Sequence, residues 1–500
     1  MMSLRRKVGR VFMLGFLGTS LDKDTAQFLT RINPGGVILF SRNFVSVAQL
    51  KYLIGQIKEL FDQRILIAID HEGGRIIRFD QGVTVFPGNM ALGISGNRKF
   101  AFQQGMISAL ELRELGININ LAPVLDVLTD SYNPGITIRS FGSHPFIVAS
   151  LGVSLIEGMQ SSGVSATAKH FPGKGAATMD AHVDLPTIDL PYEAIRTHLY
   201  PFIKAIEAGV DLVMSSHVVY SSLDSLPATF SHNIIYHLLR KELGFKGIII
   251  SDDLEMGAIG RHYAIEDAVV KCVMAGHNMV LICSNREYQE RGFNSLVEAY
   301  KSGGLRTSEL DESTRRIETL IDKKLYQADK IKPEISGTEL AKSIARCSVQ
   351  ISRDKKGLIP IKTDKKVVII YPDFSSLGDH IFLEREVMEG EGLIRKYLKV
   401  PQEKMGFFKV PWEQNMYKAN FLINKLEKTD LVIFFCFEAH AYSNQRHLLQ
   451  AIEKKFREAI VILLGSPLDE KFIGRDVSII KTYGFRRVQI EAVLNLLFNR

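Results

Sequence analysis

The segment 168–186 concentrates side chains that can move protons. It places Lys169 beside His170 and ends on Asp180 and His182, which are one residue apart. An imidazole titrates near neutral pH, and a neighbouring carboxylate can orient its ring, so the Asp180–His182 pair is suited to proton transfer. A polar surface loop is the simpler interpretation of any one of these residues. The set together indicates a functional site, because loops on a rigid scaffold often carry function.

A separate carboxylate, Asp252, follows an apolar run further along the chain. A carboxylate that faces an imidazole–carboxylate pair offers a nucleophile or charge stabiliser together with an acid/base group, and displacement at an acetal or acyl carbon requires both. A Ser–His–Asp arrangement through Ser216 and His217 is disfavoured, since no G-x-S-x-G sequence surrounds the serine. No phosphate-binding glycine pattern and no Cys/His metal spacing occurs, so we expect no cofactor and no metal.

The composition excludes several classes of protein. The 500 residues suggest about two to four domains, and 46% hydrophobic with 23% charged residues is ordinary for a globular protein. The net charge is +7, but Lys and Arg are dispersed, so we expect no nucleic-acid partner. No run approaches about 18 apolar residues, so we expect no membrane span. Segment 11–17 is interpreted as a first strand rather than a signal peptide, and the dispersed cysteines favour free thiols and a cytoplasmic protein.

Up to about residue 285, the sequence repeats a short apolar run, a polar turn and a stretch of helical periodicity. The helical stretches include 47–61, 100–115, 146–160, 191–208 and 231–243. The eight apolar runs are 11–16, 36–40, 65–70, 117–123, 165–171, 212–220, 247–253 and 278–283. Apolar strands that alternate with amphipathic helices favour a parallel sheet covered by helices, and eight such units predict a closed (β/α)8 TIM-type barrel.

The barrel prediction locates function at the C-terminal ends of the strands. Polar residues do gather in or just after the ends of the expected strands: Asp70, Lys169, His170, Ser216, His217, Asp252 and Asp253. A charged group at the end of a buried strand is costly unless it is paired. The repeated placement therefore indicates a site, and the alternative is a set of salt bridges that closes the barrel mouth.

A second apolar pattern follows a charged, helical stretch that begins near residue 303. Its strand-like runs are 348–353, 366–372, 431–437, 460–465 and 478–484. These runs predict a smaller α/β sandwich domain with a parallel core. We therefore expect a catalytic barrel at 1–325, a linker at 326–345 and an α/β sandwich domain at 346–500.

Six short motifs occur in one order within the barrel region, and together they resemble a known family. The motifs are DHEGGRIIR (70–78), IRSF (138–141), KHFPG (169–173), DAH (180–182), PAT (227–229) and SDDLEM (251–256). This ordered set resembles glycoside hydrolase family 3, most closely its bacterial β-N-acetylglucosaminidases, and it covers about residues 9 to 325. The C-terminal part also resembles the second, α/β sandwich domain of that family, with weaker signatures.

The resemblance implies a retaining hydrolase in which each role falls on a residue of this sequence. The nucleophile is Asp252, and the acid/base is His182 with Asp180 as its partner. The sugar-binding positions carry over to Asp70, Arg78, Arg139, Lys169 and His170. A His–Asp pair then replaces the second carboxylic acid of the usual two-carboxylate scheme. A Gly/Ala-rich loop lets this proton carrier move in when substrate is bound.

Two residues depart from the family pattern. Lys174 stands where the family often has His, and Asn278 stands where Asp is expected. Lys174 adds a cation near the loop, with consequences for substrate choice or phosphate affinity. Asn278 removes a charge near the eighth strand. Neither changes the expected nucleophile or its acid/base pair.

The main hypothesis is exo-hydrolysis of terminal β-linked N-acetylglucosamine from peptidoglycan fragments or chito-oligosaccharides. A phosphorylase that uses the same site is the nearest alternative, because a histidine acid/base does not repel phosphate as a carboxylate would. A β-glucosidase is disfavoured by the Asp-x-His loop. An alternative from another class is a catalytically silent sugar-binding protein. The expected partner is thus a carbohydrate, and the expected assembly is a monomer or homodimer.

Overall fold

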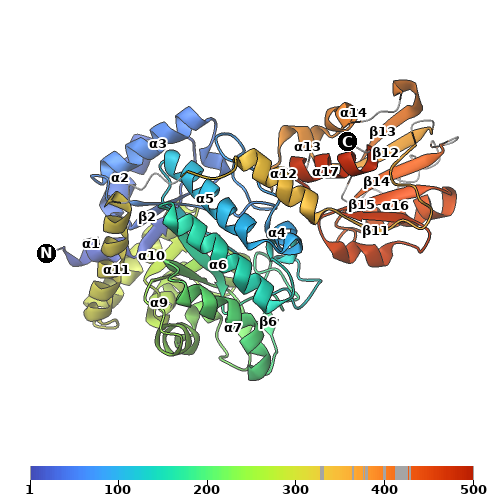
Figure 1. Ribbon diagram of the computed structural model, residues 1–500. Helices are drawn as coiled ribbons and strands as arrows, with labels where there is room; N and C mark the ends of the chain where they lie inside the picture. Colours follow the sequence, from blue (N-terminus) through green and yellow to red (C-terminus); the bar gives the residue numbers. More distant parts are fainter. Residues whose placement is uncertain are drawn as a thin grey trace.

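Eight parallel strands close into a barrel in the N-terminal part of the protein (Figure 1). The computed structural model describes residues 2–326, 332–362, 365–375, 377, 381–397, 401–411, 426 and 429–498. The barrel strands are β1 (Phe12–Leu14), β2 (Gly36–Leu39), β3 (Leu66–Ile69), β4 (Ile119–Asn120), β5 (Ser165–Phe171), β7 (Leu212–Ser215), β9 (Ile248–Asp253) and β10 (Met279–Ile282). Their order around the barrel is β1-β10-β9-β7-β5-β4-β3-β2. The predicted (β/α)8 fold is confirmed.

Helices surround the barrel because the segments between strands have one apolar face and capped ends. In α3 (Val47–Leu60), buried residues recur every three to four positions, and the Ser46 side chain accepts a hydrogen bond from the Gln49 amide. The other helices of this part are α1 (Leu4–Arg10), α2 (Lys23–Ile32), α4 (Asn89–Ser95), α5 (Arg98–Glu114), α6 (Pro145–Ser161), α7 (Tyr192–Glu207), α8 (Gly257–Gly260), α9 (Ile265–Ala275), α10 (Arg286–Lys301) and α11 (Thr307–Tyr326), with short 3-10 turns η1 (Ser41–Asn43), η2 (Thr137–Arg139) and η3 (Ala228–Phe230).

Apolar side chains from all around the barrel fill its interior. Met13, Leu66 and Met279 belong to one buried cluster with residues of the other strands. Helix α11 closes the N-terminal end of the barrel, where Ile317 and Ile321 join the same cluster. The interior is therefore a packed core, and functional groups are left to the C-terminal ends of the strands.

Two predicted elements differ from the structure. The expected strand 212–220 ends at Ser215 as β7. The Ser216 amide still donates to the Phe171 carbonyl of β5 (2.8 Å), and the chain then leaves the barrel sheet. The last part of the expected strand, β8 (Val219–Tyr220), pairs with β6 (Thr187–Ile188) in a separate two-stranded sheet. The expected helix 231–243 is a π-helix, η4 (Asn233–Glu242). Periodicity alone does not distinguish a π-helix from an α-helix at this length.

The second domain is built on a six-stranded sheet in the order β11-β16-β15-β14-β12-β13. Its elements are β11 (Gln350–Arg353), β12 (Val367–Asp373), α13 (Arg385–Glu389), α14 (Glu391–Tyr397), η6 (Gln402–Lys404), β13 (Met405–Pro411), β14 (Leu431–Phe437), α16 (Ser443–Lys455), β15 (Ala459–Leu464), η7 (Pro467–Phe472), β16 (Ser478–Lys481) and α17 (Arg487–Phe498). Only β11 runs antiparallel to its neighbour among the described strands of this sheet. The sequence did not predict β13, an edge strand that is mostly half-buried and lacks a continuous apolar run.

Helix α12 (Gly337–Ser348) joins the two parts of the molecule (Figure 1). It packs on α4 and α5 of the barrel and on α17 of the second domain. Leu340 and Ile344 of α12 belong to one buried apolar cluster that also contains Ile490 of α17 and residues of the barrel helices. The helix begins within the expected linker at 326–345, and the domain boundaries stay a prediction. No helix of the described residues is long and apolar enough to cross a membrane.

Candidate active site

Asp70, directly after β3, is the centre of an ion-pair cluster at the barrel mouth. Its two carboxylate oxygens accept hydrogen bonds from Lys169 Nζ and Arg78 Nη2, both at 2.8 Å. Burial alone would raise the pKa of Asp70, but the two cations hold it well below its usual range, so the carboxylate is ionised. The alternative expected from the sequence, a set of salt bridges at the barrel mouth, is thus present in part. Asp70 and Arg78 nevertheless keep 17% and 22% of their side chains exposed, so they remain accessible at the opening.

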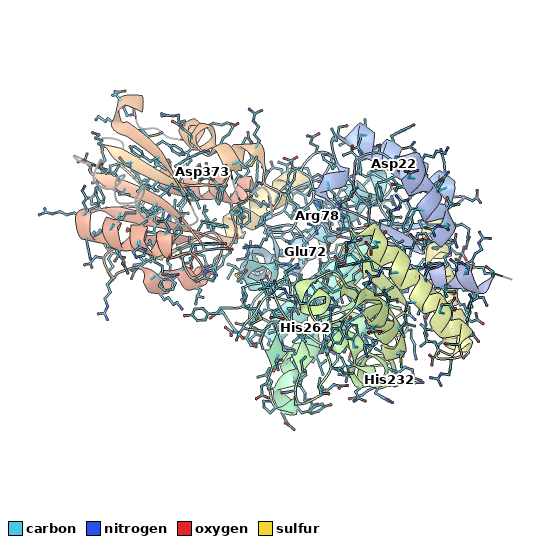
Figure 2. All side chains as sticks on the ribbon, turned by 180° about the vertical axis from the view of Figure 1, so that it is seen from behind. Asp22, Glu72, Arg78, His232, His262 and Asp373 are labelled. Atoms are coloured by element: carbon cyan, nitrogen blue, oxygen red, sulfur yellow. The ribbon has the colours of Figure 1, made fainter. Side chains whose placement is uncertain are left out.

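Glu72 extends this cluster, although the sequence analysis did not single it out. One of its oxygens lies 2.8 Å from Lys169 Nζ. Arg139 donates to both oxygens, from Nε at 3.0 Å and Nη2 at 2.8 Å. Burial lowers the pKa of Arg139, but the Glu72 carboxylate more than reverses this and keeps the guanidinium charged. Glu72 lies on the side of the barrel nearest the second domain, as does Arg78 (Figure 2). The position of Glu72 within the motif 70–78 was the feature of the sequence that could have identified it.

His170 is held by a second carboxylate that the sequence analysis also missed, Asp126. The ring Nδ1 lies 2.7 Å from Asp126 Oδ2, and both side chains are buried. Burial lowers the pKa of His170 well below its usual value, and the nearby Lys174 ammonium lowers it further. A neutral ring that donates from Nδ1 leaves Nε2 as an acceptor, which suits a sugar hydroxyl.

Asp252 lies at the end of β9 with 15% of its side chain exposed, and the nearest cation is Lys174. The Lys174 Nζ is 3.9 Å from Asp252 Oδ2, and its side chain is only 7% exposed. Burial alone would raise the pKa of Asp252, but Lys174, and then His217 and His182, lower it below the usual value. Asp252 is therefore ionised at neutral pH. An ionised, partly exposed carboxylate at a barrel mouth is suited to nucleophilic attack.

Two glycines determine how Lys174 enters the site. Gly173 has a φ of +116°, a conformation that side chains disfavour. A Cβ on Gly175 would lie 1.8 Å from the Val127 carbonyl oxygen, so only glycine allows this close approach. The Lys174 amide then donates to Asp126 Oδ1 at 2.6 Å. Asp126 thus fixes both His170 and the backbone that carries the cation.

The Asp180–His182 pair forms as expected and lies on the same mouth as Asp252. The His182 Nδ1 is 2.8 Å from Asp180 Oδ1, and 63% of the His182 side chain is exposed. Burial alone would raise the pKa of Asp180, but its hydrogen bonds from His182 lower it. The Ala181 carbonyl accepts from the Ala258 amide at 2.9 Å, in the segment that follows Asp252. The candidate acid/base pair is therefore attached to the segment that follows the candidate nucleophile.

The structure gives Ser216 and His217 no catalytic geometry. His217 uses Nδ1 toward Thr229 Oγ1 (2.8 Å) and Nε2 toward the Asp253 carbonyl (2.9 Å). The Ser216 hydroxyl is buried and has no hydrogen-bond partner among the described residues. Thr229 belongs to the motif 227–229, so this motif supports the site rather than acting in it.

Asn278 lies away from the mouth, immediately before β10. Its side-chain oxygen accepts from Arg240 Nη2 at 2.7 Å and from the Ile249 amide at 3.0 Å. Its nitrogen donates to Ser313 Oγ at 3.0 Å. The residue therefore ties the start of two strands to α11, and its role in this structure is structural.

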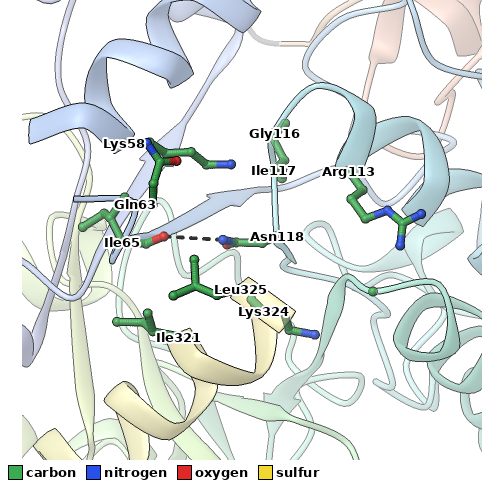
Figure 3. Close-up of a pocket in the computed structure, with 11 residues that line it drawn as sticks. Lys58, Gln63, Ile65, Arg113, Gly116, Ile117, Asn118, Ile321, Lys324 and Leu325 are labelled. Atoms are coloured by element: carbon green, nitrogen blue, oxygen red, sulfur yellow. Dashed lines mark hydrogen bonds between the residues drawn. The ribbon is translucent and has the colours of Figure 1, made fainter. Parts of the chain in front are cut away.

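A small cavity of about 100 Å³ lies at the opposite end of the barrel, beside the start of β3 and β4 (Figure 3). Its lining contains Lys58, Arg113 and Asn118 but no Asp, Glu or His. It offers no carboxylate and no imidazole, so the candidates for nucleophile and His–Asp pair remain those at the mouth. Among the described residues, no three or more His, Cys, Asp or Glu side chains are grouped as metal ligands.

The comparison with known families agrees with this geometry. Residues 3–320 match the family described as the glycosyl hydrolase family 3 N terminal domain. The chain belongs to glycoside hydrolase family 3. As a family 3 protein it is 38% identical over 290 residues to a "Beta-hexosaminidase" of Thioalkalivibrio sulfidiphilus, covering 57% of this chain and 83% of that protein.

Two solved structures extend the likeness to the second domain. A β-N-acetylglucosaminidase from Paenibacillus sp. str. FPU-7 has a TM-score of 0.92 and 29% identity, covering 100% of this chain and 97% of that one. A β-glucoside phosphorylase has a TM-score of 0.81 and 20% identity, covering 100% of this chain and 92% of that one. The second likeness shows the fold alone.

Replacing Lys174 with methionine in this family 3 hydrolase is expected to move the acidic limb of its pH–activity profile to higher pH. Lys174 lowers the pKa of Asp252, so its removal raises that pKa, and the Asp252 carboxylate becomes protonated at a higher pH as the pH falls. The measurement is kcat/KM against pH for an aryl glycoside. Lys204→Met, which removes a surface ammonium paired with Glu207, serves as the control. An unchanged limb in Lys174→Met would contradict this role.

Proposed function

We propose that the protein is an exo-acting, retaining β-N-acetylglucosaminidase that releases terminal β-linked N-acetylglucosamine. The observation that carries the proposal is the placement of an ionised carboxylate, Asp252, at the same mouth as the Asp180–His182 pair. The contact from Ala181 to Ala258 ties the pair to the segment after the carboxylate. The names of the similar proteins support the same activity.

The proposed reaction has two displacements. Asp252 attacks the anomeric carbon and forms a glycosyl ester, while the glycosidic oxygen leaves with a proton from protonated His182. Neutral His182 then removes a proton from water, the water oxygen bonds to the anomeric carbon, and the ester to Asp252 breaks. Asp180 orients the imidazole and stabilises its protonated form between these steps. Configuration at the anomeric carbon is retained, because each displacement inverts it once.

The sugar-binding positions in this proposal are Asp70, Arg78, Arg139, Lys169 and His170. The charges of the first four are fixed by pairs within the cluster before substrate arrives. Preorganised charged donors and acceptors hold sugar hydroxyls without the cost of ordering them on binding. We propose that the substrates are peptidoglycan fragments or chito-oligosaccharides in the cytoplasm.

A second candidate, phosphorolysis, is favoured by the position of Lys174. Once Asp252 is esterified it carries no charge, so the ammonium 3.9 Å away loses its nearest anion. An incoming phosphate would restore this pairing, and its oxygen would bond to the anomeric carbon as the ester breaks. The product would then be a sugar 1-phosphate in place of the free sugar.

Product analysis with and without phosphate tests both candidates. The enzyme is incubated with an aryl β-N-acetylglucosaminide, with the corresponding aryl β-glucoside and with muropeptides, and products are identified by mass spectrometry. Free N-acetylglucosamine at a rate independent of phosphate supports the hydrolase. A phosphate-dependent sugar 1-phosphate supports the phosphorylase. Faster turnover of the aryl β-glucoside contradicts the proposed sugar specificity, and sugar binding without turnover by either route contradicts both.

A further inference from the structure

A buried arginine of the second domain reaches into the turn after β3. Arg486, immediately before α17, is fully buried. Its Nε donates to the Gly74 carbonyl at 2.5 Å, and its Nη2 lies 3.5 Å from the Arg75 carbonyl. On its other side, Nη1 donates to Glu384 at 2.9 Å, so the guanidinium is anchored within its own domain. One side chain thus connects the second domain to backbone carbonyls of the barrel.

A second contact holds the same turn through one of its own side chains. The Arg75 guanidinium pairs with Glu438, which follows β14 of the second domain. Glu438 is 6% exposed and has a φ of +49°, a conformation that few non-glycine residues adopt. The backbone there is therefore arranged to present this carboxylate to the barrel. The two contacts come from different places in the second domain, the residue before α17 and the residue after β14.

The turn itself has little freedom to move independently. The Gly74 amide donates to the Phe86 carbonyl, and the Glu72 amide donates to the Ile76 carbonyl, both at 2.9 Å. A Cβ on Gly74 would lie 2.7 Å from the Gly88 Cα, so the two segments are in close backbone contact. A force on the Gly74 carbonyl is therefore passed to the backbone of Glu72.

Glu72 connects the turn to the proposed sugar site. Its carboxylate bonds both Lys169 and Arg139, and its side chain is only 2% exposed. A shift of its backbone would displace both cations, and a shift of about 1 Å in a site can cost roughly 100-fold in rate. We propose that Arg486 and Glu438 are positioning residues, which hold the turn 72–76 so that Glu72 aligns Lys169 and Arg139 for the sugar. The choice of a sugar substrate in this inference rests on the proposed function. The hydrogen exchange of the turn can be measured without it.

The contacts have a second interpretation, in which they only attach the domains to each other. Helix α12 already joins the domains through apolar packing. Attachment alone predicts lost stability and a smaller fraction of folded enzyme, which lowers kcat without changing KM. Positioning predicts that KM for the sugar changes as well. It also predicts faster opening of the turn while the rest of the barrel is unaffected.

The experiment compares Arg486→Met and Glu438→Gln with Arg487→Met. Arg487 is the matched control, because it is adjacent and pairs with Glu386 and Glu491 of its own domain. We expect kcat/KM for an aryl β-N-acetylglucosaminide to fall about 10- to 100-fold in both test variants, with a raised KM. Hydrogen exchange of the amides at 73–77 should be at least about 10-fold faster. The control should match the wild type in both measurements.

A double-mutant cycle with Glu72→Gln tests the route of the effect. If Arg486 acts through Glu72, the loss from Arg486→Met becomes smaller once Glu72 is replaced. Glu438→Gln keeps the inference testable if Arg486→Met does not fold. Wild-type KM and wild-type exchange at 73–77 in a folded variant would overturn the inference. A wild-type enzyme that does not turn over the glycoside contradicts the proposed function instead, and the exchange measurement still decides the role of Arg486.

Discussion

Asp252→Ala is expected to lower kcat/KM for an aryl β-N-acetylglucosaminide on the order of 10⁵-fold, as loss of a catalytic nucleophile does in other hydrolases. The side chain is partly exposed, and Lys174 lowers its pKa so that it is ionised, and its removal deletes the attacking oxygen. The measurement is chromophore release under single-turnover and steady-state conditions.

Azide provides the control for the Asp252 variant. A small anion in the space left by the carboxylate can attack the same face of the sugar, and a single inversion then yields the α-glycosyl azide. Restored turnover with this product identifies the missing group as the nucleophile. The assignment fails if Asp252→Ala retains wild-type turnover. It also fails if a slow fluorinated substrate labels a peptide that does not contain Asp252.

His182→Ala is expected to lower kcat/KM by about 10³-fold for substrates with poor leaving groups, the usual range for loss of a general acid. For a dinitrophenyl glycoside, whose leaving group needs no proton, formation of the glycosyl ester should proceed at close to the wild-type rate. The ratio between the two substrates is the diagnostic quantity, because a folding defect would slow both equally.

The chain supplies a matched control for this histidine. His262 is also exposed and paired with an aspartate, with its Nε2 2.6 Å from Asp184 Oδ1. It lies in the loop after α8 and is labelled in Figure 2. His262→Ala is expected to leave the ratio between leaving groups unchanged. An unchanged ratio in His182→Ala would contradict its role as the acid/base.

The barrel was predictable because its strands are buried on both faces and therefore appear as continuous apolar runs. Strand β13 was not, since a half-buried edge strand has mixed composition. The interruption between β7 and β8 was hidden as well, because the chain stays buried from Leu212 to Val218, the polar Ser216 and His217 included, while it changes sheets. The apolar pattern of a sequence indicates which segments are buried, but it does not indicate which sheet a segment joins.

The site residues were predictable where they follow strands or lie in the ordered motifs. What the sequence does not contain is the pairing between them. Glu72 was part of a recognised motif, but only the structure shows that it joins Lys169 to Arg139. Asp126 and Arg486 act across 44 and 412 positions, on His170 and Gly74. Contacts at such separations depend on the closed fold, and one sequence gives no periodic signal for them.

The closure of the barrel by α11 has a kinetic consequence for the proposed reaction. With Ile317 and Ile321 packed into the interior, ligands exchange through the opposite end. The glycosyl ester of the proposed reaction then imposes an order of departure at this one mouth: the aglycone leaves first and the sugar last. The released sugar therefore rebinds to the free enzyme and competes directly with substrate. The aglycone instead competes with water for the glycosyl ester, and its attack transfers the sugar to the aglycone.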